Sequence, residues 1–176
     1  MISWNPRVAS VLLVCLAACH HEQARPAVAD ATIRVPPTAS ATSDEKQDAE
    51  LARRVAVLAA IVPCFAIDSH GETANLPCVE SEAIGEAGTP SKTFAAARLV
   101  VESAGRTQLL ALLSHPSALV RAYVARWVAE KLPEDRGRLK PLLADHTRVM
   151  TIDGCIGRES TIALVVADAL RSASER

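Results

Sequence analysis

Apolar residues recur at helical spacing through most of the chain that follows Ser43. Residues 44–62 and 91–103 each carry one apolar stripe, so we predict a long helix at each place. Ser43 is expected to cap the first helix, and Gly105 to follow the end of the second. The stripe of the first helix consists of Leu51, Val55, Leu58 and Val62. This first helix is expected to cover the open end of the domain.

The same pattern occurs twice later in the chain, once in residues 107–132 and once in residues 137–172. Each copy has a short helical segment with paired leucines, a polar break and a second helical segment, which is the organisation of a helical hairpin. The second copy is longer by eight residues, 151–158, which we expect to form a loop. The positions that superpose include Leu109 and Leu139, Leu112 and Leu142, Val124 and Ile162, and Val128 and Val166.

The first copy, LLALLSHPSALVRAYVARWVAEKL, resembles a HEAT repeat. The likeness lies in its paired leucines, in a turn that contains Pro116, and in Val120 followed by Arg121. The second copy departs from this pattern, because no arginine follows the pair Val149-Met150. The resemblance implies a short, α-solenoid-like array of helical hairpins, an architecture that serves to bind other proteins.

The composition also favours helices. Ala, Leu and Val dominate, whereas the chain has only two Trp, one Tyr and two Phe, which disfavours a sheet core or an aromatic sugar-binding platform. Tyr123 and Trp127 lie on the apolar stripe of a predicted helix and are expected in the core. We therefore predict an all-α domain over residues 43–176. The net charge of −1 gives no electrostatic reason to expect a nucleic-acid partner.

Residues 1–18 have the organisation of a signal peptide. Arg7 precedes an apolar run of about ten residues, roughly half of what crosses a ~30 Å hydrocarbon core, so a transmembrane helix is disfavoured. The run ends in LAAC, which resembles the lipobox of bacterial lipoproteins and whose last residue is Cys19. The resemblance implies cleavage before Cys19, lipid on its sulfur and a stable membrane anchor. An ordinary secretory signal with a chance cysteine is the alternative.

Residues 19–42 are rich in Ala, Pro, Thr and Ser and show no apolar periodicity, so we predict a flexible linker ahead of the folded domain. His20 stands where an aspartate would, by resemblance, retain a lipoprotein in the inner membrane. The resemblance thus implies a periplasm-facing protein of the bacterial cell envelope, on the outer rather than the inner membrane. The adjacent His20 and His21 have no third ligand nearby, so no metal site is predicted there.

Three further cysteines remain after export into an oxidising compartment. We favour a disulfide between Cys64 and Cys78, which would close a loop of about 15 residues and contribute roughly 3 kcal/mol in the chain-entropy model. Pairing of Cys155 with either of them stays open, because the sequence does not choose between the pairings. A zinc site at Cys64, His70 and Cys78 is disfavoured, since the short Cys-x2-Cys spacing and a fourth ligand are missing. We predict no metal and no other cofactor.

Few residues of the domain suggest catalysis. Cys155 and His146 are the residue types of a thiol nucleophile and its base, so a small thiol-dependent enzyme is the alternative function. The sequence of the domain contains no phosphate-binding loop, no metalloprotease spacing and no nucleophile elbow. The sequence therefore predicts a non-catalytic module that binds another protein of the cell envelope.

Two places are candidates for the binding surface. The segment inserted in the second copy carries Asp153, Cys155 and Arg158, and it would present them between two helices. Arg121 is the candidate on the first helical hairpin, where it would project into a repeat groove. An ion pair with Asp145 of the adjacent copy is the other role open to Arg121.

Overall fold

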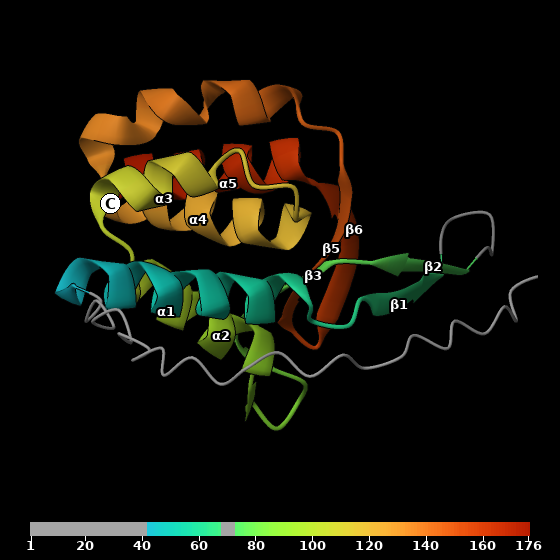
Figure 1. Cartoon of the computed structure of the whole chain (residues 1–176). Coiled ribbons are helices and arrows are strands. Elements are labelled where there is room, and N and C mark those ends of the chain that lie inside the picture. The colour runs from blue at the N-terminus through green and yellow to red at the C-terminus, as the bar shows by residue number, and fades with distance from the viewer. Residues whose placement is uncertain (1–41, 68–72) are drawn as a thin grey trace, which may run out of the picture. The chain divides into compact units, whose positions relative to one another are not determined.

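The computed structural model describes residues 42–67 and 73–176 (Figure 1), in which one helix is followed by four strands, four helices, two strands and a final helix. The helices are α1 Ser43–Ala59, α2 Lys92–Ser103, α3 Arg106–Leu112, α4 Ala118–Lys131, the 3-10 helix η1 Pro133–Ala144, and α5 Ile162–Ser174. The strands are β1 Cys64–Ile67, β2 Thr73–Leu76, β3 Cys78–Ile84, β4 Thr89–Pro90, β5 Arg148–Gly154 and β6 Ile156–Thr161. The predicted signal peptide, the lipidation site Cys19 and nearly all of the predicted linker lie outside the described residues.

The domain contains two β-sheets, so the prediction of an all-α domain is wrong. β1 and β2 form an antiparallel hairpin, and the second sheet has the strand order β4-β3-β5-β6. β3 and β5 run parallel with Cys78 opposite Met150, whereas β5 and β6 form an antiparallel hairpin. Residues 151–158, which we predicted to form a loop, belong to that second hairpin.

The sequence of residues 148–154 is compatible with a β-strand when a neighbouring strand can pair with it. Val149, Thr151 and Ile152 are β-branched, and Gly154 turns the chain with a positive φ of 57°. Val149 is fully buried and joins the core, as does Val79 of β3. Because β3 lies far earlier in the chain, helical periodicity within the repeat did not reveal its pairing with β5.

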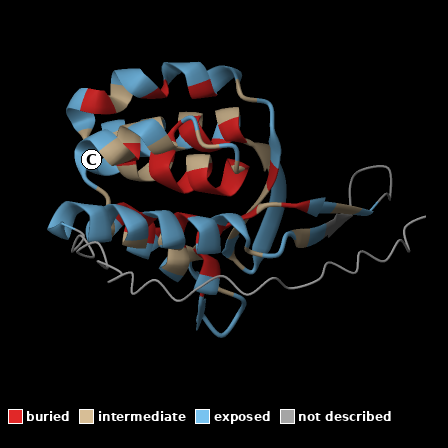
Figure 2. Ribbon diagram, in the orientation of Figure 1, coloured by how far each residue is buried: buried red, intermediate tan, exposed pale blue. Residues whose placement is uncertain are grey.

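Helix α4 lies at the centre of the core, where Figure 2 shows most of its surface as buried. Nine of its fourteen residues are buried, so α4 has buried side chains on most of its faces and not on one stripe alone. It packs against α5, η1, α1 and α2, and small side chains such as Ala122 and Ala125 let these neighbours approach closely. α4 is therefore the element that positions the other helices.

The predicted first helix is confirmed with adjusted ends. Leu51, Val55 and Leu58 form its buried stripe, whereas Val62 lies beyond the helix with 81% of its surface exposed. The capping residue is Thr42, one residue before the expected Ser43, and its side chain accepts a hydrogen bond from the Glu45 amide. No helix among the described residues is both long enough and apolar enough to span a bilayer.

The predicted repeat holds as a helical hairpin only in its first copy. α3 and α4 form that hairpin, but the second copy consists of η1 and α5 with the β5–β6 hairpin between them, so the HEAT-like, α-solenoid-like array is wrong. Pro133 and Pro141 lack an amide hydrogen, which disfavours α-helical hydrogen bonding along η1. The superposed Leu109 and Leu139 are both buried. The sequence repeat therefore reflects shared core positions and not a shared architecture.

Candidate functional site

Arg121 holds three segments of the domain together and is not free to meet a partner. Its guanidinium lies 2.9 Å from the Asp145 carboxylate and donates a further bond to the Thr147 hydroxyl. It also donates to the backbone carbonyls of His115 and Pro116, at 2.7 and 2.8 Å. Only 13% of the Arg121 side chain is exposed. The ion pair with Asp145, the other role that the sequence left open, is thus confirmed.

The other predicted surface residues lie on the β5–β6 hairpin. Asp153, Cys155 and Arg158 are exposed there, with the free thiol of Cys155 in the turn between the strands. Arg121 contacts Thr147, which precedes β5, whereas this turn follows β5. At about 3.3 Å per residue the seven residues of β5 separate these places by roughly 20 Å. The structure therefore does not bring the predicted surface residues into one site.

The same strand separates the residues of the thiol-enzyme alternative. His146 precedes β5 and Cys155 follows it, so they lie at opposite ends of an extended segment. A base that activates a thiol must lie within hydrogen-bond reach of it. Cys155 and His146 do not meet this requirement, and the structure gives the pair no support as a catalytic centre.

Cys64 and Cys78 form the disulfide that we favoured. Their Cα atoms lie 5.6 Å apart, within the usual range for a bridge. The bridge joins β1 to the start of β3, and Cys78 is buried. A carboxylate oxygen of Glu80 lies within 4.8 Å of both sulfurs, but a disulfide offers no thiolate to a metal ion. His70, the third residue of the zinc hypothesis, lies outside the described residues.

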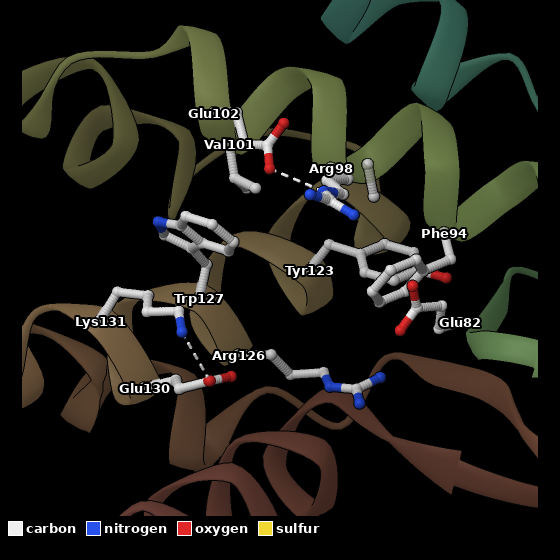
Figure 3. A pocket seen from close by; sticks show the side chains of 11 residues that line it. Glu82, Phe94, Arg98, Val101, Glu102, Tyr123, Arg126, Trp127, Glu130 and Lys131 are labelled. Atoms are coloured by element: carbon white, nitrogen blue, oxygen red, sulfur yellow. Dashed lines mark hydrogen bonds and ion pairs between the residues drawn. The ribbon is translucent and has the colours of Figure 1, made fainter.

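A groove of ≈ 470 Å³ runs between α2 and α4 (Figure 3). Its aromatic residues are Phe94 from α2 and Tyr123 and Trp127 from α4. The rings of Phe94 and Tyr123 meet edge to face with their centroids 6.4 Å apart. We call this hollow the α2/α4 groove; its charged lining residues are Glu82, Arg98, Glu102, Arg126, Glu130 and Lys131.

Tyr123 fixes the α4 side of this groove by hydrogen bonding to strand β3. Its hydroxyl accepts a hydrogen bond from the Glu80 amide at 2.7 Å and donates one to the Glu80 carbonyl at 2.9 Å. Burial raises the pKa of Tyr123 well above its usual value, so the phenol stays protonated and keeps its donor. The Glu80 carboxylate in turn accepts a hydrogen bond from Ser91, the residue that caps α2. Both walls of the groove are thereby tied to β3.

Replacing Tyr123 with Phe is expected to lower the free energy of unfolding by about 2–4 kcal/mol. The change keeps the ring but leaves the Glu80 amide and carbonyl without a partner, at about 1–3 kcal/mol for each buried polar group. Urea unfolding followed by circular dichroism measures the loss. Trp127→Phe, on the same helix but with no hydrogen bond from its indole among the described residues, is the matched control. A loss of similar size in both variants would contradict the role assigned to the hydroxyl.

Most charges that line the α2/α4 groove are already paired. Arg98 binds Glu102 at 2.7 Å, and Lys131 binds Glu130 at 2.9 Å and lies 5.8 Å from the centre of the Trp127 ring. The pKa of Glu130 is lowered, chiefly by its hydrogen bond with Lys131. Arg126 differs from these residues, because its guanidinium has neither a hydrogen bond nor an ion pair within the described part of the chain; only its charge acts on Glu130, as a minor cause of the lowered pKa.

Two further hollows lie around the core helix. One, of ≈ 360 Å³, is lined by β3, β5 and α5 and shares Arg126 and Glu130 with the α2/α4 groove, so the two adjoin at α4. The other, of ≈ 630 Å³, lies between α3 and η1. Its polar lining includes the Arg121–Asp145 pair and His115, whose pKa is lowered by burial and by Arg121.

Sequence reasoning missed the α2/α4 groove. We expected Trp127 in the core, but it is only partly buried and faces the groove beside Arg126. The available signal was an arginine directly before the tryptophan on a helix whose other residues are largely apolar. The groove could not be predicted from this pair alone, because its other wall is α2, whose position against α4 is a tertiary feature.

No protein-family model, no curated protein and no solved structure matches this chain.

Proposed function

We propose that this chain is a lipid-anchored lipoprotein of the bacterial cell envelope whose folded domain binds another protein through the α2/α4 groove. The observation that carries the proposal is the pairing of Trp127 with Arg126. Both are partly buried in a groove, and neither the indole N–H nor the guanidinium has a hydrogen-bond partner among the described residues. Tryptophan and arginine in such settings are enriched among the residues that dominate binding energy at protein interfaces.

The chemistry of the groove favours binding over catalysis. Of its nucleophilic groups, the Tyr123 hydroxyl is bonded to the backbone of Glu80. The Lys131 amine and the carboxylates of Glu130 and Glu102 are held in ion pairs. The groove is open and combines apolar rings with charged groups at its rim, which is the usual build of a protein-binding patch. The sequence LAAC before the domain supports the anchor at Cys19 and hence a partner in the envelope.

Site-specific photocrosslinking in the bacterial envelope tests the binding surface. A photoreactive phenylalanine analogue replaces Trp127 in the full-length chain, and in a control it replaces Val57, which is 52% exposed on α1. We expect one light-dependent adduct of defined mass from position 127 and none from position 57. Absence of an adduct at 127, or the same adducts from both positions, would contradict the proposed surface.

The anchor is tested by the intact mass of the mature protein purified from bacterial membranes. We expect a chain that begins at Cys19 and carries the added mass of a diacylglyceryl group and an amino-terminal acyl chain. The Cys19→Ser variant is expected to lose this mass and to leave the membrane fraction. A mature chain without lipid would refute the anchor and leave the groove to be judged by the crosslinking result.

A further inference from the structure

Arg126 is the cation of the α2/α4 groove that makes neither a hydrogen bond nor an ion pair among the described residues, although its charge contributes to the lowered pKa of Glu130. Arg98 is neutralised by Glu102, and Lys131 by Glu130. Arg176, which lines the adjoining hollow, also binds Glu130, at 3.5 Å. Because a guanidinium has five donors and Arg126 is partly buried, its bonds to water are restricted and a bidentate anion would replace them favourably.

The position of Arg126 makes it accessible from two sides. It lines both the α2/α4 groove and the adjoining hollow formed by β3, β5 and α5. In Figure 3 its side chain extends away from Glu130, which Lys131 binds, toward the side of the groove where Glu82 lies. An elongated ligand that crosses α4 would therefore pass over the guanidinium.

The neighbours of Arg126 disfavour a ligand that carries several negative charges. Glu82 lies on the same side of the groove, and Glu130 adds a second carboxylate to the lining. These groups oppose a polyanion such as a nucleic acid, and the net charge of −1 gives no long-range attraction for one. Trp127 and Phe94 offer apolar surface beside the guanidinium.

On the basis of the proposed function, we infer that the groove takes an acidic peptide segment of the protein partner. The carboxylate of one Asp or Glu side chain binds Arg126 through paired hydrogen bonds, and an adjacent apolar side chain packs against Trp127. The segment carries one acid and not a run of acids, because Glu82 repels a second one.

A random octapeptide display library, selected on the full mature chain in detergent, tests this inference. We expect the selected peptides to share one acidic position beside an apolar one. Synthetic copies are then compared with versions in which the acid is replaced by its amide. Trp127 reports binding directly, since the other tryptophan, Trp4, lies in the predicted signal peptide. The amide versions are expected to bind roughly tenfold to a hundredfold more weakly.

Three variants assign the preference to Arg126. Arg126→Gln is expected to lose the distinction between acid and amide, whereas Arg126→Lys, which retains the charge, keeps part of it. Arg98→Gln is the matched control, because it lines the same groove but its guanidinium already binds Glu102. Arg126→Gln removes no ion pair within the described residues, so its melting temperature is expected to equal that of the wild type.

The outcomes separate this inference from the proposed function. Peptides that change Trp127 fluorescence but show no acid preference, or an acid preference that persists in Arg126→Gln, would overturn the carboxylate assignment and leave the binding role in place. If no peptide is enriched above the display control, the assignment is also overturned. The crosslinking result at position 127 decides the proposed function independently.

Discussion

Replacing Arg121 with Met lowers the free energy of unfolding by about 3 kcal/mol, on the order of 10 °C in melting temperature for a domain of this size. Methionine keeps the unbranched stem but removes the bonds to Asp145, Thr147 and the carbonyls of His115 and Pro116. The Asp145 carboxylate is then left in a site where only 18% of its side chain is exposed. Differential scanning calorimetry of the purified mature chain measures the change.

Arg53→Met is the matched control for this prediction. Arg53 also binds a carboxylate, that of Glu50, but 67% of its side chain is exposed and water screens the pair. Its loss is expected to leave the melting temperature unchanged. Equal effects of Arg53→Met and Arg121→Met would show that the position of Arg121 between three segments has no energetic consequence.

The effect of Arg121→Met is also expected to depend on pH. Burial raises the pKa of Asp145, but hydrogen bonds from Thr147 and Arg121 outweigh burial, so the net pKa is lowered. A carboxyl group with a lowered folded-state pKa adds stability above its ordinary pKa of about 4 and loses it as the pH falls through the folded value. The difference between wild type and variant should therefore shrink below about pH 4. A difference that stays constant down to pH 2 would exclude Asp145 as its source.

Removing the disulfide in the variant Cys64→Ala/Cys78→Ala is expected to cost about 3 kcal/mol of folding free energy. The cysteines are 14 residues apart, and a loop of that length contributes about 3 kcal/mol through the entropy of the unfolded chain. The bridge also holds the β1–β2 hairpin to the first residue of β3, beside the fully packed Val79. Equilibrium urea unfolding with and without a thiol reductant measures the loss, which only the wild type should show on reduction.

Cys155→Ala controls for the removal of a thiol. This cysteine is exposed and free, so its replacement is expected to change neither the urea midpoint nor the response to reductant. If Cys155→Ala abolishes the response to reductant, the bridge involves Cys155 and not the Cys64–Cys78 pair alone. That result would restore the pairing that the sequence had left open.

Helices with a regular apolar stripe were predictable because they depend on neighbours three and four residues away. Helix α1 was predictable from the stripe formed by Leu51, Val55 and Leu58, and the break at Pro116 separates α3 from α4. The Cys64–Cys78 bridge was the pairing that we favoured, although the sequence left pairings with Cys155 open. The partner of Arg121 was predictable as one of two options, because the repeat placed Asp145 beside it.

The sheet was not predictable from the repeat. Cys78 pairs with Met150 across a parallel register, and no local pattern connects segments so far apart in the chain. The 151–158 segment looked like an insertion because the flanking copies align as helices, although its β-branched residues and the Asp153-Gly154 turn also suit a hairpin. The α2/α4 groove likewise depends on where α2 packs, and this position places Trp127 and Arg126 at its surface.

The sequence by itself determined the helical stripes, because each is encoded by residues close together in the chain. Only the tertiary structure decided that β3 pairs with β5, that Arg121 holds the domain together, and that Arg126 makes no ion pair within the described part of the chain. These features arise from contacts between distant segments, and their free energy depends on which groups bury one another. The candidate site belongs to this second class.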